Sequence, residues 1–525
     1  MDKITSVTGD FSTTGQVGPE DMAAIAALGF RAIISNRPDG EDAGQPSAKA
    51  VAEAAEAAGL SFAHLPVTTR DIAPPDAQAM REAIERLPGP ILAFCRTGAR
   101  SQAMYAAAMK AGGPALDYDV VIVGGGSAGI ACAASLLKRQ PDLSIAVVEP
   151  AEIHYYQPGW TLVGAGVFKP EATFRPMADV MPPAAHWLHQ RAAAFHPDDN
   201  QVELAEGARV GYRALVVAAG IKLDWDAIPG LRQALGENGV TSNYRYDLAP
   251  YTRDLVRTLA KGKALFTQPP MPIKCAGAPQ KAMYLSCHAW ERDGRLREID
   301  VEFHTAGSVL FGVPEYVPAL MRYIERYMIG LQLGSTLIEV DGPGRRAVFR
   351  RMLGQRSETF ARSFNMLHAV PPQVAPDFVA TSPLADETGF VEVFPATLQH
   401  RRWPNVFALG DVATTSNAKT AAAARKQAPV VAINLLAMLD GKAPQAAYDG
   451  YGSCPLTVER GKIVLAEFGY GGKLLPSFPS WLLDGRRPTR RAWFLKDRIL
   501  PPIYWHGMLK GREWLARPAR VDQPQ

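Results

Sequence analysis

The chain has 525 residues, which at about 150 residues per domain is enough for three or four domains. Hydrophobic residues make up 47% and charged residues 21%, a globular balance that excludes a disordered chain or a fibrous repeat. The net charge of +4 gives no reason to expect nucleic-acid binding. Five cysteines in this length do not form a disulfide framework, so we expect a reducing compartment.

The first 110 residues are predicted to form a small α/β domain. Residues 30–34 and 90–94 are short apolar strand candidates, and the Ala-rich stretch 49–58 is a helix candidate. The segment 111–117, which contains Gly-Gly-Pro, is predicted to be a linker.

Residues 118–440 alternate apolar strands with helices, a pattern typical of doubly wound, Rossmann-like parallel sheets, and we expect two interleaved dinucleotide-type folds there. Residues 441–525 are richer in Pro, Gly, aromatic residues and Arg, and we interpret them as a region for quinone and membrane association. Ten Lys or Arg and two Asp or Glu lie within 485–520, where basic residues would attract anionic headgroups. A solvated surface helix is the alternative. Pro501-Pro502 predicts two short helical elements instead of one continuous helix.

A strand of apolar residues runs directly into a G-x-G-x-x-G motif and then into a helix. Gly124, Gly126 and Gly129 are the three glycines, and Ser127 stands at the start of the helix. Such glycines let the backbone approach a pyrophosphate at the helix N-terminus, where the dipole favours anions. Glu149 ends the next strand, at the distance where an acid binds a ribose hydroxyl. The pattern predicts dinucleotide binding, with a glycine-rich turn as the alternative.

Two further strands favour FAD as the cofactor. One apolar run ends at Gly220, and another ends at Gly410-Asp411. Both are similar to the accessory strands of flavoproteins with two dinucleotide folds, in which such an acid meets the ribityl chain. A simple turn acid is the alternative for Asp411.

A second nucleotide site is not expected. The strand at 264–267, where such flavoproteins carry a second glycine motif, runs into Gln268-Pro-Pro-Met-Pro and reaches Cys275. Proline has no backbone N–H to offer a pyrophosphate. The electron donor is therefore expected to be a compound that a thiol attacks, and not NADH.

Several segments resemble the sulfide:quinone oxidoreductases, especially the branch that includes the mitochondrial enzyme. They are residues 154–166, 272–281, 397–402, 418–423 and 451–456, within a resemblance that spans about 118–517. The resemblance implies FAD, a quinone as acceptor and peripheral attachment to a membrane. We expect sulfide or a small thiol or persulfide as the donor, and a cytoplasmic location on the inner face of the membrane. The resemblance also implies that Cys275 attacks sulfur and that Lys419 neighbours the flavin pyrimidine ring. A solvated lysine is the alternative for Lys419.

The sequence departs from this family at one important position. The family uses two cysteines on the flavin face, and the second normally follows the Gly-Asp of the last FAD strand, where this chain has Val412. An altered activity, an external thiol or a different cysteine of the chain would each account for the difference. Cys132, Cys287 and Cys454 are interpreted as buried structural residues.

Cys95 lies in a loop between an apolar strand and an Ala-rich helix, where converging amides would stabilise a thiolate facing Arg100. Four residues separate Cys95 from Arg100, the spacing of rhodanese sulfurtransferases, whereas phosphotyrosine phosphatases have five. The whole domain nevertheless resembles the phosphatase-like domain of β-lactamase-hydrolase-like proteins. Sulfane-sulfur transfer, phosphatase-type hydrolysis with Asp71 as the acid, and an inert domain all remain open.

The leading hypothesis is an FAD enzyme that passes electrons from sulfide or a related sulfur compound to a quinone, with an N-terminal Cys-loop domain. One alternative is an NAD(P)H:quinone oxidoreductase. The other is a sensor without turnover that is coupled to a phosphatase-like switch.

Overall fold

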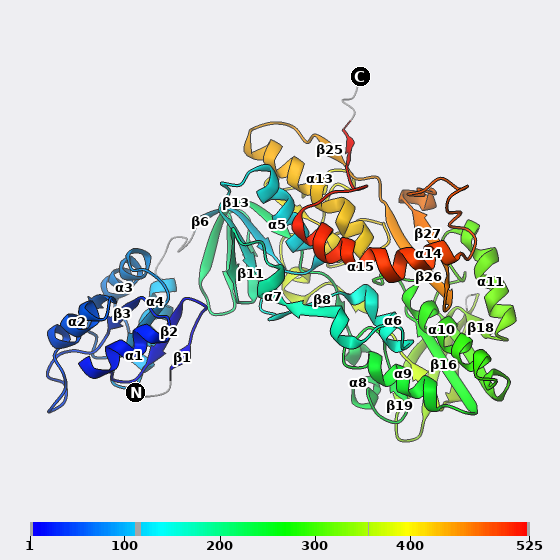
Figure 1. The fold of residues 1–525 in the computed structure, drawn as a ribbon, viewed down its shortest axis with the longest axis horizontal. Coiled ribbons are helices and arrows are strands. Elements are labelled where there is room, and N and C mark those ends of the chain that lie inside the picture. Colours follow the sequence, from blue (N-terminus) through cyan, green and yellow to red (C-terminus); the bar gives the residue numbers. More distant parts are fainter. Residues whose placement is uncertain (1–3, 111–116, 355, 522–525) are drawn as a thin grey trace. The chain divides into compact units, whose positions relative to one another are not determined.

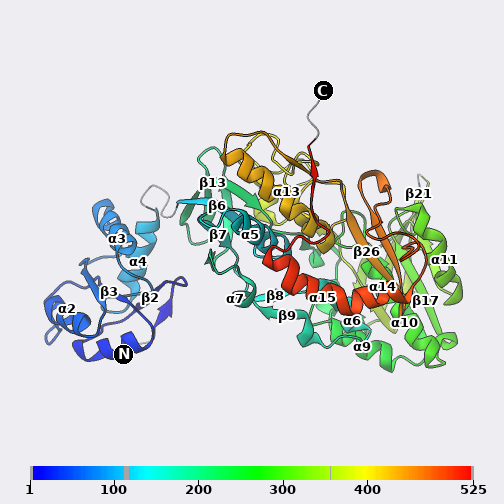
Figure 2. The same cartoon turned by 45° about the horizontal axis from the view of Figure 1, so that its top comes forward.

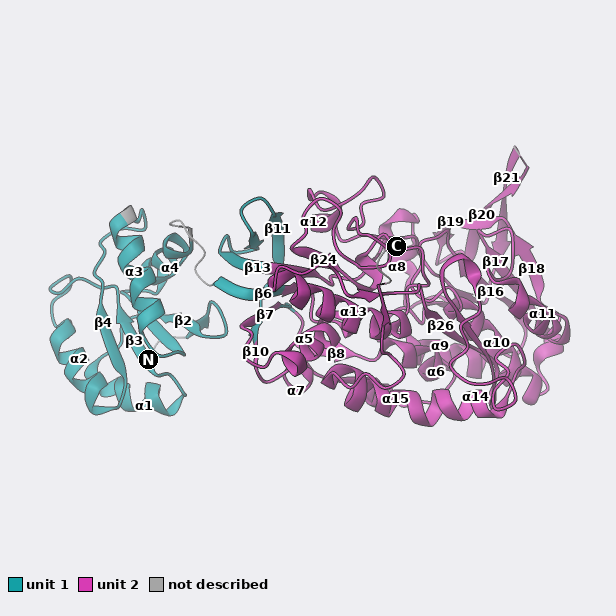
Figure 3. Cartoon of the chain, turned by 90° about the horizontal axis from the view of Figure 1, so that it is seen from above, with its two compact units in different colours: residues 1–121, 148–150, 186–213 teal, residues 122–147, 151–185, 214–525 magenta. Residues whose placement is uncertain are grey.

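The computed structural model describes residues 4–110, 117–354 and 356–521 (Figure 1). Residues 111–116 of the predicted linker lie outside the described residues. The chain divides into two compact units, shown in Figure 3. The first comprises residues 1–121, 148–150 and 186–213, and the second comprises residues 122–147, 151–185 and 214–525.

The N-terminal α/β domain is a five-stranded sheet between two pairs of helices. The strand order is β1-β2-β5-β3-β4, and all pairs are parallel except β1 with β2. Helices α1 and α2 share one hydrophobic core with the sheet, and α3 and α4 share the other. The bounds are β1 Thr5–Ser6, β2 Phe11–Thr14, α1 Met22–Ala27, β3 Ala32–Ser35, α2 Ala48–Ala57, β4 Ser61–His64, α3 Pro74–Arg86, β5 Ile91–Phe94 and α4 Ala99–Lys110.

A seven-stranded sheet carries the predicted dinucleotide motif. Its order is β10-β7-β6-β13-β12-β11, and β24 pairs in parallel with β13. Helices α5 and α13 pack against each other beside this sheet (Figures 1 and 2). The bounds are β6 Asp117–Val123, α5 Ser127–Arg139, β7 Ile145–Val148, β10 Ala185–Leu188, β11 Ala192–His196, β12 Gln201–Leu204, β13 Arg209–Val217, β24 Val406–Ala408 and α13 Ala421–Leu439.

A second, fully parallel sheet has the order β15-β22-β16-β17-β18. Helices α10 and α11 contribute to the large hydrophobic core on this sheet. A mixed seven-stranded sheet and a fully parallel five-stranded sheet, each with its own helices, confirm the predicted α/β class. The bounds are β15 Val240–Thr241, α9 Ala249–Thr258, β16 Gly262–Gln268, α10 Ala278–Arg292, β17 Ile299–Thr305, α11 Val317–Arg326, β18 Gly330–Leu333 and β22 Met366–His368.

Shorter elements complete the fold. The three strands β19 Ser335–Asp341, β20 Arg346–Leu353 and β21 Arg356–Ser363 form an antiparallel sheet. The others are β8 Ile153–Tyr155, α6 Trp160–Gly164, β9 Phe174–Pro176, α7 Met177–Val180, β14 Lys222–Leu223, α8 Leu231–Ala234, β23 Gln373–Val374, α12 Asp377–Ala380, β25 Ala446–Ala447 and β28 Ala519–Arg520.

The C-terminal region begins with the hairpin of β26 (Gly452–Glu459) and β27 (Lys462–Phe468), and β26 packs against α10. Helical turns then run without a break from residue 490 to residue 510, through α14 (Arg490–Phe494) and α15 (Leu500–Pro502). The predicted separation into two elements at Pro501-Pro502 is therefore wrong. The two prolines lie within α15, and wide π-helical turns precede and follow them, so the helical path continues past residues that cannot donate a backbone N–H.

Candidate functional site

The turn after β6 has the shape that a pyrophosphate requires. Gly124 has a φ of +109°, and a Cβ there would lie 2.5 Å from the Ala218 carbonyl oxygen. A Cβ on Gly129 would lie 1.9 Å from the Gly124 oxygen, so the loop is pressed against its own helix. Gly126, the N-cap of α5, instead has no atom within 4 Å of a Cβ position. The loop therefore packs closely against backbone atoms at Gly124 and Gly129 and leaves open space at Gly126, as expected of a dinucleotide-binding loop.

The other predicted cofactor residues also stand at strand ends. Gly220 follows β13 with a φ of +74°, and Gly410-Asp411 follows β24, the parallel neighbour of β13. The Gly410 N–H donates a 2.7 Å hydrogen bond to Gln427 Oε1 on α13. Glu149 directly follows β7, and its carbonyl oxygen accepts a 2.8 Å hydrogen bond from the Trp187 indole.

Tyr504, from the C-terminal helical segment, reaches the start of α5. Its hydroxyl is 2.5 Å from the Ser127 hydroxyl and 2.6 Å from His154 Nε2. Burial lowers the pKa of His154 to about 4, so this imidazole is neutral at physiological pH. The predicted cofactor residue Ser127 is thus part of a hydrogen-bonded chain that sequence reasoning did not anticipate.

Lys419 is buried beside the Gly-Asp loop. Its Nζ donates hydrogen bonds of 2.7 Å to the Asp411 carbonyl and 2.9 Å to the Ala413 carbonyl. The alternative of a solvated lysine is therefore wrong. Burial lowers the pKa of Lys419 and raises that of Asp411, and the attraction between the two charges opposes both changes. Val412, between these residues, is fully buried.

Cys275 is held next to this loop in a strained conformation. Its φ is +50°, which is uncommon outside glycine, and its N–H donates a 2.7 Å hydrogen bond to the Lys419 carbonyl. The buried Lys281 amine donates to the Cys275 sulfur over 3.1 Å. A hydrogen bond from Cys454 and the positive charge of Lys281 hold the pKa of Cys275 well below its usual range, despite burial. Both effects favour the thiolate form of Cys275.

Cys454, on β26, is the hydrogen-bonding partner of Cys275. It is buried, and the hydrogen bond to Cys275 together with burial raises its pKa well above that of a free thiol. Sequence analysis interprets Cys454 as a buried structural residue, and the structure shows that it is buried and also contacts Cys275. The available signal was its position inside segment 451–456, one of those that resemble the family. Cys132 and Cys287 are buried with raised pKa values, as expected of structural thiols.

A second lysine approaches Cys275 from the C-terminal segment. Lys496 is buried, its Nζ donates a 2.9 Å hydrogen bond to the Pro158 carbonyl, and it lies 5.6 Å from the centre of the Tyr156 ring. Burial and the nearby Lys281 lower the pKa of Lys496 to about 7, while Cys275 opposes the shift. A residue expected on a solvated or membrane-facing surface is thus part of the sulfur site.

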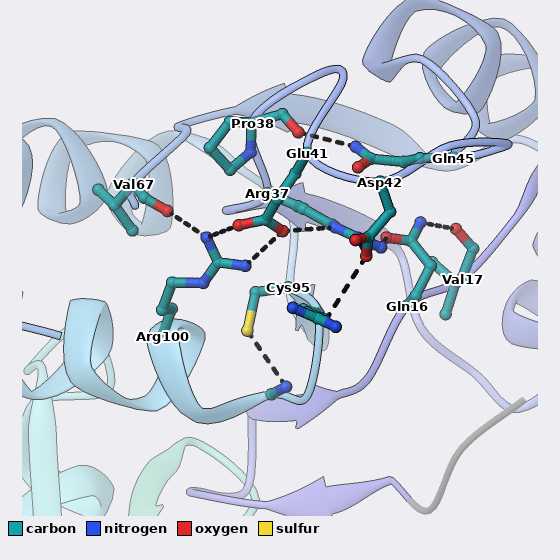
Figure 4. A network of polar contacts seen from close by, with 12 residues as sticks. Gln16, Val17, Arg37, Pro38, Glu41, Asp42, Gln45, Val67, Cys95 and Arg100 are labelled. Atoms are coloured by element: carbon teal, nitrogen blue, oxygen red, sulfur yellow. Dashed lines mark hydrogen bonds and ion pairs between the residues drawn. The ribbon is translucent and has the colours of Figure 1, made fainter. Parts of the chain in front are cut away.

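The N-terminal Cys-loop follows β5 and opens α4 (Figure 4). The buried Cys95 sulfur accepts a 3.1 Å hydrogen bond from the Gly98 N–H. Burial raises the pKa of Cys95, but hydrogen bonds from the amides of Ser101, Thr97 and Arg100 bring it below the usual value. The loop therefore stabilises a thiolate, as the sequence predicts.

Arg100 is fixed by a carboxylate that sequence reasoning did not single out. Glu41 accepts hydrogen bonds of 2.7 and 2.8 Å from the Arg100 guanidinium, and Arg37 donates to the same carboxylate over 2.8 Å (Figure 4). The bonds from Arg100 lower the pKa of Glu41 to about 2. Asp71, the candidate phosphatase acid, lies on an exposed loop, where its N–H donates to Thr69 Oγ1.

Comparison with known proteins finds two family models within the chain. Residues 3–112 match the family model of the phosphatase-like domain of β-lactamase hydrolase-like protein, and residues 118–269 match that of pyridine nucleotide-disulphide oxidoreductase. The mitochondrial sulfide:quinone oxidoreductase of Dictyostelium discoideum is 39% identical over 403 residues, covering 76% of this chain and 87% of the relative. The chain belongs to the sulfide:quinone oxidoreductase family. This finding confirms the resemblance stated from the sequence, the class of FAD-dependent oxidoreductase and the predicted cofactor.

Two further relatives extend the comparison. The mouse mitochondrial sulfide:quinone oxidoreductase is 37% identical over 394 residues, covering 75% of this chain and 87% of the relative. The X-ray structure of the Aquifex aeolicus sulfide:quinone oxidoreductase has a TM-score of 0.62 at 19% identity, covering 76% of this chain and 92% of that one, and so supports the fold. Within residues 4–110, 117–354 and 356–521, no helix has the length and apolar character to cross a membrane.

Proposed function

We propose that the chain transfers two electrons from sulfide to a quinone, with Cys275 as the residue that reacts with sulfur. The observation that carries this proposal is the position of the Cys275 sulfur, which accepts a hydrogen bond from Lys281, while the Cys275 N–H donates to the Lys419 carbonyl. Bound FAD would supply a two-electron acceptor that a quinone can reoxidise. Gly124, Gly126 and Gly129 would hold its pyrophosphate, and Asp411 its ribityl chain.

The chain's own residues prepare sulfur chemistry in two ways. Lys281 keeps Cys275 ionised, which makes it a nucleophile and a good leaving group. Lys419 places a buried positive charge beside the Gly-Asp loop, where it would favour added negative charge on a bound flavin. Tyr504 and Lys496, both buried, bring the C-terminal segment into contact with Ser127 and Pro158.

Membrane attachment is part of the proposal. Trp481, Phe494 and Trp514 are 80%, 58% and 56% exposed, and they are interspersed with exposed basic residues. Exposed aromatic side chains and basic groups together suit the interface of an anionic bilayer, from which a quinone could enter. We place the enzyme in the cytoplasm, on the inner face of the membrane.

Steady-state reduction of a short-chain ubiquinone analogue tests the function directly. Purified holoenzyme should reduce the quinone with sulfide and should not reduce it with NADH or NADPH. Turnover with NADH would instead support the NAD(P)H:quinone oxidoreductase alternative. A protein that binds FAD and turns over with neither donor would support the sensor alternative.

For the N-terminal domain we propose sulfane-sulfur transfer at Cys95. The support is the backbone hydrogen bonding that lowers the pKa of Cys95, the loop of four residues between Cys95 and Arg100, and the exposed position of Asp71. Thiosulfate and cyanide should yield thiocyanate in the wild type and not in Cys95→Ser. Hydrolysis of p-nitrophenyl phosphate without thiocyanate formation would support the phosphatase alternative.

A further inference from the structure

Cys275 and Cys454 lie on different elements but belong to one hydrophobic core, in which Cys454 is buried and Cys275 packs against it. Cys275 is on the turn before α10, Cys454 is on β26, and the packing of α10 against β26 brings them into hydrogen-bonding contact. The Gly277 N–H also bonds to the Cys454 sulfur. A Cβ on Gly277 would lie 3.7 Å from Cys454 Cβ and 2.5 Å from Leu456 Cδ2, so the two segments touch closely.

The two thiols are also chemically unequal. Cys275 faces the ammonium group of Lys281 at 3.1 Å, whereas Cys454 lies inside the hydrophobic core with Leu456, and 1% of its surface is exposed. A disulfide between unequal sulfurs opens in one preferred direction, because the sulfur with the lower pKa leaves faster. At the position where the family carries its second cysteine, Val412 has no group that could form a disulfide.

We propose that Cys454 is the second redox cysteine of this chain and forms a reversible disulfide with Cys275 in the oxidised enzyme. This inference rests on the proposed function and goes beyond it by naming the partner thiol. Joining Cys275 and Cys454 forms one S–S bond, releases the Cys454 proton and yields two electrons, which pass to FAD and then to quinone.

Sulfide reopens the bond in a balanced exchange. HS⁻ forms a bond to the Cys454 sulfur, the bond between Cys454 and Cys275 breaks, and its electron pair leaves on Cys275 as the thiolate that Lys281 stabilises. Cys454 then carries the sulfane sulfur as a persulfide. Transfer of that sulfur to a thiol or to a second sulfide ion leaves Cys454 reduced, and the pair is ready to be oxidised again.

Peptide mapping tests the pair in the wild-type holoenzyme. After oxidation with quinone, the protein is denatured in iodoacetamide without reductant and digested. The Cys275 and Cys454 peptides should be linked, while Cys132 and Cys287 are alkylated. After one equivalent of anaerobic sulfide the link should be gone and one extra sulfur should be found on the Cys454 peptide, whereas excess sulfide should leave both thiols reduced. Two fully alkylated thiols at 275 and 454 in the oxidised enzyme would overturn the proposal.

Variants separate this inference from the proposed function. Cys454→Ser should keep FAD but reduce it with sulfide about 100-fold more slowly or worse, because the exchange needs both sulfurs. Cys287→Ser, another buried cysteine of the same core, should behave like wild type. If wild type fails to react with sulfide, the proposed function fails. If wild type reacts and Cys454→Ser matches it, only the Cys454 assignment fails. Should Cys454→Ser not fold, the mapping in wild type decides.

Discussion

The Lys281 ammonium group lies 3.1 Å from the Cys275 sulfur, and both side chains belong to the segment that opens α10. A free thiol has a pKa of about 8.5, and a neighbouring cation lowers it by stabilising the thiolate. The position of Lys281 on α10 therefore favours the thiolate form of Cys275.

Replacing Lys281 by a neutral residue should disfavour the ionised form of Cys275. In Lys281→Met the pKa of Cys275 should rise, so the reduced enzyme should be alkylated by iodoacetamide more slowly at neutral pH and recover its rate as the pH is raised. Wild type should keep a fast rate to a lower pH. The rate of Cys275 alkylation against pH, followed by mass spectrometry, provides the measurement. Superimposable profiles would show that Lys281 does not control the thiol.

A side chain added to the predicted pyrophosphate loop should prevent FAD binding without preventing folding. Gly126→Val adds a side chain in the open space before α5 without meeting protein atoms, so the protein should fold but lose its bound FAD and its yellow colour. Gly312→Val is a matched control, since its added Cβ also meets nothing within 4 Å. Full flavin absorbance in purified Gly126→Val would refute the assignment of this loop.

Because Glu41 is ion-paired with Arg100, the stability of the N-terminal domain should fall at acidic pH. The pKa of Glu41 is about 2 in the folded state, below its usual value of 4.5, so the stabilisation that its ion pairs provide is present above pH 4.5 and is lost as the pH falls toward 2. Glu41→Gln should remove this pH dependence and lower the rate of sulfur transfer by misplacing Arg100. Melting temperature against pH and thiocyanate formation measure the two effects. An unchanged acid profile would contradict the role of Glu41.

Membrane attachment should depend on exposed aromatic residues. The double variant Trp481→Ser with Phe494→Ser should bind anionic phospholipid vesicles about tenfold more weakly in a sedimentation assay. Each substitution removes an exposed aromatic side chain that would insert into the membrane interface. The control Met352→Ser with Leu353→Ser removes comparably exposed side chains from β20 and should bind normally. High salt should release part of the wild type. Equal binding by both double variants would contradict this surface.

The predictable parts of the site were those encoded locally. Gly124, Gly126 and Gly129 follow one another in a short motif, and Cys95 and Arg100 share one loop, so spacing alone indicated their chemistry. Their local contacts agree with those expectations.

Contacts between distant segments could not be predicted in this way. Cys454 reaches Cys275 only because β26 packs on α10, and Lys496 and Tyr504 enter the site because helical turns continue through Pro501-Pro502. The basic, aromatic composition of the C-terminal segment suggested a surface element, but composition does not tell which face of a helix is buried. Val412 stands where the family has its second cysteine, whereas Cys454, the partner that we propose for Cys275, lies in another part of the chain.

Anaerobic mixing of the holoenzyme with sulfide tests the central claim most directly. Sulfide should bleach the flavin absorbance of wild type, and one equivalent of quinone should restore it. Cys275→Ser should retain FAD but lose this bleaching by on the order of 10³-fold in rate, because a serine hydroxyl is not ionised at neutral pH and cannot take part in sulfur exchange. If Cys275→Ser is bleached by sulfide as fast as wild type, sulfide oxidation at Cys275 is contradicted.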